Sequence, residues 1–201
     1  MERFSREEDK KYRKIFGAVA WPGKRPGFAV VVGQNKELHL GGHDIVFLDE
    51  FESGDTKALV RVCGGLDYFY RPDIWIGDTK NDAADKFIRE MNIENKSFER
   101  RMEGQRSFKI RRSPLLDMKN AFAYFFPVLK ELLNPDRRRL FLKEGSKLKA
   151  YMYQPQESDL PAIQFGDYPS IESLAFAVFE MNQQRDSGPR QTHAINQYKQ
   201  F

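Results

Sequence analysis

The chain opens with three short runs of apolar residues separated by turn-forming residues. The runs are residues 15–21, 28–32 and 45–48, and a Pro- and Gly-rich segment at 22–27 joins the first two. Runs of this length, rich in β-branched and aromatic residues and bounded by glycine and proline, are typical of strands. The pattern therefore predicts three consecutive strands that form an antiparallel meander.

After the third run, the apolar spacing becomes helical, returns briefly to strand-like, and becomes helical again. Residues 56–70 are predicted to be a helix, with Asp55 placed to cap its N-terminus. Residues 74–76 form a short apolar strand that ends at Gly77-Asp78, and residues 81–91 are a second amphipathic helix. Alternating helix and strand after a meander predicts an α/β fold, with a mixed sheet flanked by helices.

The second half of the chain is less regular. Residues 95–114 are polar and basic, and we assign them no element. The pattern further on predicts a helix at 117–133 with an aromatic stripe and Pro127 as a kink site, a strand at 139–142, a helix at 146–153, a loop at 154–165 and a closing helix at 171–181.

Composition limits the class of protein and the domain count. A length of 201 residues with 40% hydrophobic residues is enough for one domain with a real core. We expect a charged leader or linker at 1–13, the folded domain at 14–182 and a disordered polar tail at 183–201. Cys63 is the single cysteine, which excludes an internal disulfide and a thiolate metal cluster. No apolar run approaches the roughly 18 residues of a membrane span, and the charged N-terminus is unlike a signal peptide, so a cytoplasmic location is expected.

Several acidic residues stand where a metal site would need them. Asp78 directly follows an apolar strand, at the sheet edge where ligands bind in open α/β sheets; its alternative role is to cap the next helix. Glu50 ends the third strand, with a solvent-facing position as its alternative. Asp167 lies just before the closing helix, where it is also placed to act as a cap. Glu172 lies inside the apolar stretch of that helix. The alternative to a metal-binding role is that its side chain faces solvent. Carboxylates that converge would hold Mg²⁺ or Mn²⁺, which activates water.

Basic residues gather between the second helix and the third. The whole chain carries 33 Lys and Arg against 29 Asp and Glu, so its formal charge is only +4 and local clustering matters more. Such a cluster predicts salt-dependent contacts with DNA phosphates; its alternative is a solvated surface balanced by nearby glutamates. The candidate contacts are Lys96, Arg100, Arg101, Arg106, Lys109, Arg111 and Arg112.

These segments together resemble the C-terminal nuclease domain of phage terminase large subunits, a member of the ribonuclease H-like superfamily. The resemblance extends from about residue 15 to residue 182. The order of the matching segments is more specific than any one of them. They are residues 16–21 and 26–33 for the opening hairpin, 45–51 for the third strand, 76–78 for the second acid, 139–142 before the closing helix, and 166–177 for the final acidic motif.

The resemblance implies a ribonuclease H-like fold and metal-dependent cleavage of double-stranded DNA during phage genome packaging. Asp78, Asp167 and Glu172 would then hold Mg²⁺ or Mn²⁺, and Glu50 would assist. The implied partners are double-stranded DNA, an ATPase domain or subunit, and the portal protein of a packaging complex. The implied setting is the cytoplasm of a host cell or of a bacterium that carries a prophage.

The chain departs from the family at the first strand. The family has an aspartate there, directly before an aromatic residue, and this chain has Ala20 before Trp21. Loss of that carboxylate weakens metal binding, so a catalytically inactive DNA-binding or packaging module is the alternative to a nuclease. An α/β protein-interaction module with no nucleic-acid role is a third interpretation.

Overall fold

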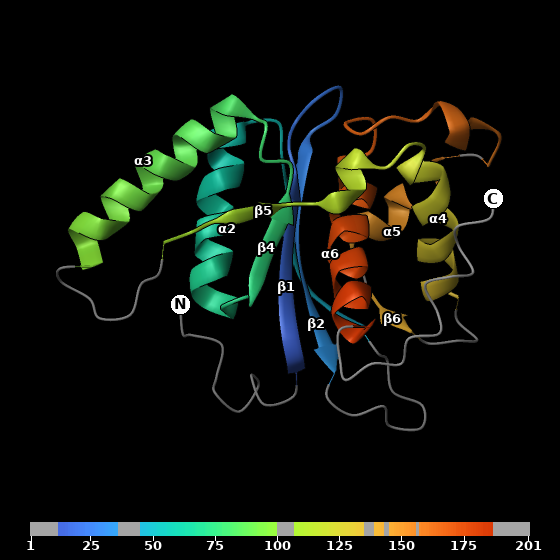
Figure 1. Cartoon of the computed structure of the whole chain (residues 1–201), viewed down its shortest axis with the longest axis horizontal. Helices are drawn as coiled ribbons and strands as arrows, with labels where there is room; N and C mark the ends of the chain where they lie inside the picture. Colours follow the sequence, from blue (N-terminus) through green and yellow to red (C-terminus); the bar gives the residue numbers. More distant parts are fainter. Residues whose placement is uncertain are drawn as a thin grey trace.

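A six-stranded mixed sheet lies between two layers of helices (Figure 1). The computed structural model describes residues 12–35, 45–99, 107–134, 139–142, 145–155 and 157–186. The strands are β1 (Tyr12–Ala20), β2 (Gly27–Asn35), β3 (Ile45–Ser53), β4 (Ile74–Gly77), β5 (Ile110–Arg112) and β6 (Leu140–Phe141). The helices are α2 (Thr56–Tyr70), α3 (Asp82–Glu99), α4 (Ala121–Leu132), α5 (Lys147–Tyr151) and α6 (Pro169–Asp186), with 3-10 turns at Pro114–Asp117 and Glu157–Ala162.

The strand order is β5-β4-β1-β2-β3-β6. β1, β2 and β3 form the expected antiparallel meander, while β4 lies parallel to β1 and β5 lies parallel to β4. Parallel neighbours need a crossover connection, which α2 provides before β4 and α3 provides before β5. The carboxyl ends of β1, β4 and β5 therefore meet at one end of the sheet.

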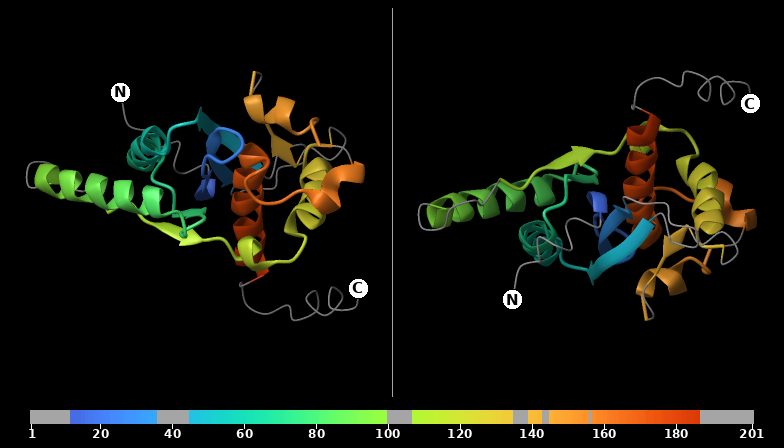
Figure 2. Two further views of the ribbon diagram at one scale, coloured as in Figure 1. Left: turned by 90° about the horizontal axis from the view of Figure 1, so that it is seen from above. Right: turned by 90° about the horizontal axis from the view of Figure 1, so that it is seen from below.

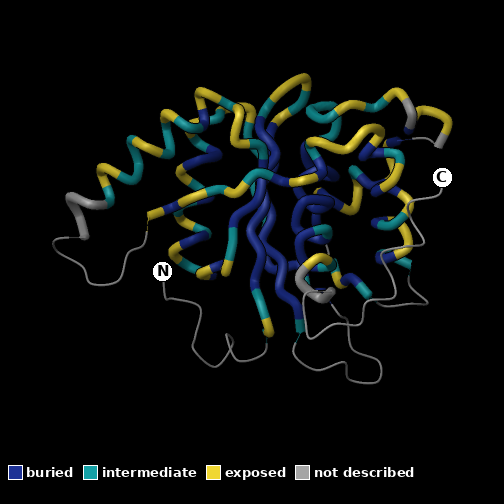
Figure 3. The backbone as a smooth tube through the Cα atoms, in the orientation of Figure 1, coloured by how far each residue is buried: buried dark blue, intermediate teal, exposed yellow. Residues whose placement is uncertain are grey.

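Both faces of the central strands are buried, as Figure 3 shows for β1 and β2. Side chains alternate along β1: Ile15 and Val19 pack toward α2 and α3, whereas Phe16 and Ala18 pack toward α6. α6 is buried on nearly all sides from Pro169 to Met181, because the sheet, α4 and α5 pack around it. Figure 2 shows that α3 extends away from the body of the domain.

Gly17 allows Trp75 to lie across β1. A Cβ atom at Gly17 would lie only 2.5 Å from the Trp75 ring, so a larger residue would displace the indole. The Trp75 indole N–H donates a 3.0 Å hydrogen bond to the buried Asp67 carboxylate. This contact ties β4 to α2 and fixes the strand that leads to Asp78.

Most predicted elements are present, and the differences have local causes. Asp55 caps α2, since its carboxylate accepts a 2.9 Å hydrogen bond from the Lys57 N–H. The predicted helix at 117–133 is divided, because Asn120 adopts a left-handed conformation (φ 57°) before α4 begins. β5 lies within residues 95–114, for which the sequence pattern predicts no element.

Some predictions fall outside the described residues. These include most of the leader, at residues 1–11, and the end of the tail, at residues 187–201. α6 continues to Asp186, past the expected domain boundary at 182. The division into leader, domain and tail stays a prediction. None of the described helices has both the length and the apolar character that a membrane crossing requires.

Candidate metal and nucleic-acid site

Ala20 and Asp78 are neighbours at the carboxyl ends of β1 and β4. Val19 pairs with Gly77 in the parallel register, so the next residues along the two strands are Ala20 and Asp78. Adjacent strands lie about 4.8 Å apart, so a carboxylate at position 20 would lie beside that of Asp78. Ala20 is instead buried in the apolar core on the α6 side of the sheet.

The Asp78 carboxylate is held by protein donors. Its Oδ1 accepts hydrogen bonds of 2.9 Å from both the Lys80 N–H and the Arg112 guanidinium. The backbone carbonyl of Asp78 accepts a 2.7 Å hydrogen bond from the Trp21 indole N–H. Asn81 caps α3, because its side-chain oxygen accepts a 2.9 Å hydrogen bond from the Ala84 N–H.

Arg112 joins two carboxylates at this end of the sheet. One of its guanidinium nitrogens contacts Asp78, and the other donates a 2.8 Å hydrogen bond to Asp117. The Arg112 guanidinium lowers the pKa of Asp117, and the two carboxylates raise the pKa of Arg112, chiefly through the hydrogen bond to Asp117. A positive charge of the protein itself therefore already pairs with the Asp78 carboxylate.

Glu172 is buried, and its carboxylate accepts hydrogen bonds from the backbone just before α6. Its side chain accepts hydrogen bonds from the Gly166 N–H at 2.7 Å and the Tyr168 N–H at 3.1 Å. Phe122 and Leu115 lie among the apolar residues around it. Burial raises the pKa of Glu172 to about 7, an effect that the two N–H donors oppose. The Glu172 carboxyl therefore already has two hydrogen-bond donors of the protein itself.

Asp167 pairs with a lysine from the β1–β2 turn. Its carboxylate accepts hydrogen bonds of 2.8 Å from Lys24 and 2.9 Å from the Gln164 N–H. The Lys24 ammonium is the main reason that the pKa of Asp167 lies below its ordinary value. Arg25, the next residue, lies 4.2 Å from the centre of the Tyr168 ring. The β1–β2 turn is thus fastened to the loop before α6.

Glu50 lies away from Asp78, at the start of α5. Its carboxylate accepts hydrogen bonds from the Ser146 hydroxyl at 2.9 Å and the Lys147 N–H at 2.7 Å. β2 and β1 separate β3 from β4. The three strand spacings from β4 to β3 amount to about 14 Å. Glu50 therefore caps a helix on a different part of the sheet.

Three of the seven candidate DNA contacts have described side chains, and they differ in their surroundings. Lys109 is exposed and has no ion pair within the described chain. Arg111 pairs with the buried Glu180 of α6, and Arg112 pairs with Asp78 and Asp117. The remaining contacts lie outside what the structure describes: Arg100, Arg101 and Arg106, and the side chain of Lys96.

Sequence reasoning did not identify the cations that hold the candidate acids. Lys24 and Asp167 are 143 residues apart in sequence, and Arg112 and Asp78 are 34 apart. Local sequence carries no signal for such pairs, because they form only when the sheet brings the strand ends together. Arg112 was predicted to contact phosphate, and no signal in its own segment pointed to Asp78.

The donor set does not fit a catalytic metal ion. Across the described residues, no group of three or more His, Cys, Asp or Glu side chains is placed to hold one. Asp78 has an arginine as its partner, Asp167 has a lysine, and Glu172 accepts hydrogen bonds from two backbone N–H groups. Mg²⁺ binds through carboxylates that are charged and accessible, so these side chains would have to exchange partners first.

The sheet defines the class of fold. A three-strand antiparallel meander, followed by β4 and β5 parallel to β1 and covered by helices on both faces, is a ribonuclease H-like fold. The fold expected from the sequence is therefore confirmed. No protein-family model and no curated protein sequence matches the chain.

Among solved structures, the chain is similar to nuclease domains of phage large terminases. One is the g2p large terminase nuclease domain of bacteriophage SPP1 with bound Mn, with a TM-score of 0.53 and 14% identity over 90% of this chain and 94% of that one. Another is the large terminase of a thermophilic bacteriophage, with a TM-score of 0.52 and 10% identity over 85% of this chain. The chain spans 40% of that second protein. At these identities the similarity is one of fold.

Proposed function

We propose that this chain is a terminase-type domain that binds double-stranded DNA in phage genome packaging without cutting it. The observation that carries the proposal is Ala20, which stands beside Asp78 where a second carboxylate would be needed. The Asp78 carboxylate is bound to Arg112 instead. An ATPase domain or subunit and a portal protein would be the partners of such a module.

The basic segment that ends in β5 supports binding to the DNA backbone. β5 is the edge strand of the sheet next to β4, and the exposed Lys109 lies directly before it. Phosphate contacts of this kind give affinity and position without reading sequence. The fold similarity to two large-terminase structures, one of them a nuclease domain, supports DNA as the ligand.

A second candidate function is metal-dependent cleavage of the same DNA. It is favoured by the position of Asp78 at the carboxyl end of β4 and by the Mn bound to the SPP1 nuclease domain. Asp78, Asp167 and Glu172 would be the ligands of Mg²⁺ or Mn²⁺, with Glu50 as a further acid. The ion pairs of Asp78 and Asp167 argue against it.

Replacing Lys109 by alanine is expected to weaken binding of a blunt DNA duplex. Lys109 is exposed and has no described acid beside it, so its ammonium is available to a phosphate. Loss of one phosphate contact costs roughly tenfold in affinity at about 0.1 M salt, and it lowers the slope of log K against log salt by about 1. Fluorescence anisotropy of a labelled duplex measures both quantities.

Lys130→Ala is the matched control, because Lys130 is an exposed lysine on α4, on the opposite face of the sheet. Equal losses for the two variants would mean that the lysines act only through net charge. Absence of any binding by the wild-type protein at low salt would reject a DNA-binding function and favour a protein-interaction module.

A further inference from the structure

Asp117 ends the 3-10 turn that follows β5, and its carboxylate is the outer partner of Arg112. One guanidinium nitrogen of Arg112 donates a 2.8 Å hydrogen bond to Asp117, and the other pairs with Asp78 at 2.9 Å. The Asp117 side chain is 68% exposed, so its carboxylate can turn into solvent without disturbing the core. Asp117 is therefore an exchangeable partner of the arginine.

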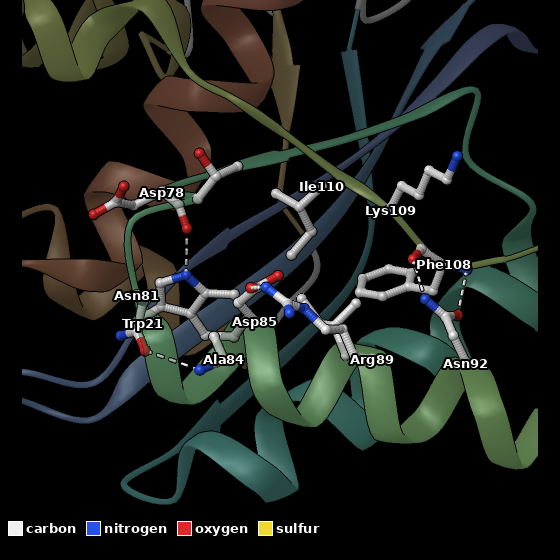
Figure 4. A pocket seen from close by; sticks show the side chains of 12 residues that line it. Trp21, Asp78, Asn81, Ala84, Asp85, Arg89, Asn92, Phe108, Lys109 and Ile110 are labelled. Atoms are coloured by element: carbon white, nitrogen blue, oxygen red, sulfur yellow. Dashed lines mark hydrogen bonds and ion pairs between the residues drawn. The ribbon is translucent and has the colours of Figure 1, made fainter.

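The Arg112 guanidinium, in contrast, is held in place by β4. Arg112 lies opposite Gly77 in the parallel register. The Asp78 carboxylate that pairs with it also accepts from the Lys80 N–H, and the Asp78 carbonyl is bound to the Trp21 indole (Figure 4). Figure 4 shows the Asp78 carboxylate turned away from that indole. The second guanidinium nitrogen therefore points to a position that an anion from solvent can reach.

A second cation lies near this position. Lys80 is exposed, and its N–H shares the Oδ1 atom of Asp78 with the Arg112 guanidinium. The pKa of Asp117 lies below its ordinary value, chiefly because of the Arg112 hydrogen bond and to a smaller extent because of the charge on Lys80. The Asp117 carboxylate thus occupies a position that two cations make favourable for an anion.

A phosphate group suits the same position. Arginine binds phosphate as it binds carboxylate, because its planar N–H groups match the oxygens of either group. An exposed ion pair is weak in water, so a phosphate can replace Asp117 on the guanidinium at little cost. The pairing with Asp78 remains intact, because it uses the other guanidinium nitrogen.

We propose that Arg112 and Lys80 form a binding site for a backbone phosphate of DNA, and that the Asp117 carboxylate occupies this site in the free protein. Asp117 competes with the DNA and limits its affinity. The inference rests on the proposed DNA binding. Exchange of one anion for another releases no net counterion, so the Arg112 contact adds nothing to the salt dependence while Asp117 is present.

Replacing Asp117 by asparagine is expected to raise the affinity for a blunt DNA duplex roughly fivefold at about 0.1 M salt, because the phosphate then meets Arg112 without a competitor. The added contact makes the slope of log K against log salt steeper by about 0.9. Asp159→Asn is the matched control, since it removes the same charge at an exposed position in the turn Glu157–Ala162. It should change the affinity by less than about twofold.

The same substitution in an Arg112→Gln background separates the site from simple charge repulsion. There, Asp117→Asn should have no larger effect than Asp159→Asn. A fivefold gain that persists without Arg112 would mean that Asp117 acts by repelling the DNA, and it would overturn the proposal. Urea unfolding of each variant checks that the domain is folded at the conditions of the anisotropy titrations.

A titration with inorganic phosphate at constant ionic strength tests the site without DNA. NMR shifts of the arginine Nε–H groups are followed in the wild-type chain and in Asp117→Asn. Arg112 is expected to shift in both, with half-saturation at a several-fold lower phosphate concentration in the variant. Arg89, which is paired with Asp85 on α3, is the internal control and should stay unshifted.

The two probes distinguish the possible failures. Absence of an Arg112 shift in both proteins, with phosphate and with duplex, overturns the proposal, and duplex binding that survives this result leaves the proposed function intact. An Arg112 shift with the duplex identifies DNA as the ligand. An Arg112 shift with phosphate in a chain that binds no duplex keeps the anion site but rejects the DNA-binding function.

Discussion

Raising the salt concentration from about 50 mM to about 200 mM is expected to weaken binding of a DNA duplex by roughly five hundredfold. Each neutralised phosphate releases counterions. Arg111 and Arg112 pair with acids of the protein, so contact by the other five of the seven basic residues from Lys96 to Arg112 gives a slope of log K against log salt of about −4.5. The reason for so steep a loss is that the proposed function relies on charge and not on base recognition.

Anisotropy titrations of the same duplex at four or more salt concentrations measure this slope. A duplex of unrelated sequence is the control, and it should give the same slope and nearly the same affinity, because phosphate contacts carry no sequence information. A slope near zero, with tight binding throughout, would contradict an electrostatic interface on the basic segment.

Replacing Glu172 by glutamine is expected to remove a pH dependence of about 3 kcal/mol from the free energy of unfolding. Burial raises the pKa of Glu172 from an ordinary 4.5 to about 7, so the folded state binds the proton more tightly than the unfolded state does. This stabilising contribution is complete below about pH 4.5. It is lost as pH rises through about 7, which corresponds to about 3 kcal/mol.

Glutamine imitates the protonated side chain, since its oxygen still accepts from the Gly166 and Tyr168 N–H groups. The variant should therefore match the wild-type protein near pH 4.5 and exceed it in stability near pH 8. Urea unfolding at the two pH values measures the difference. Glu90→Gln, at a partly exposed site on α3, is the control and should change stability by less than about 0.5 kcal/mol. Parallel pH profiles for wild type and Glu172→Gln would reject the raised pKa.

The sequence predicted the fold because its strongest local signals agree with its topology. The apolar runs at 15–21, 28–32 and 74–76 are all central strands, and buried strands read as nearly continuous apolar runs. β5 was not predicted, because its three residues include Arg111 and Arg112 and its place in the sheet depends on backbone pairing with β4.

The candidate site was harder to predict, for a physical reason. The sequence pattern predicts that Asp78 lies at the end of a strand. It does not predict which donors contact the carboxylate, and these decide whether it is available to a ligand. Lys24, in the β1–β2 turn, contacts Asp167, and Arg112, on β5, contacts Asp78; both pairs join residues that are far apart in the sequence. Backbone N–H groups just before α6 donate to Glu172. Ala20 is the one local departure from the set of acids that the resemblance implies.

Nicking of a supercoiled plasmid in the presence of Mn²⁺ tests the central claim most directly, with wild-type protein and Asp78→Ala side by side. If the carboxylates at this end of the sheet are bound to the protein's own cations and N–H groups, both proteins should leave the plasmid as intact as a protein-free sample. Mn²⁺-dependent nicking by the wild-type chain that Asp78→Ala abolishes would contradict the account and identify the domain as a nuclease.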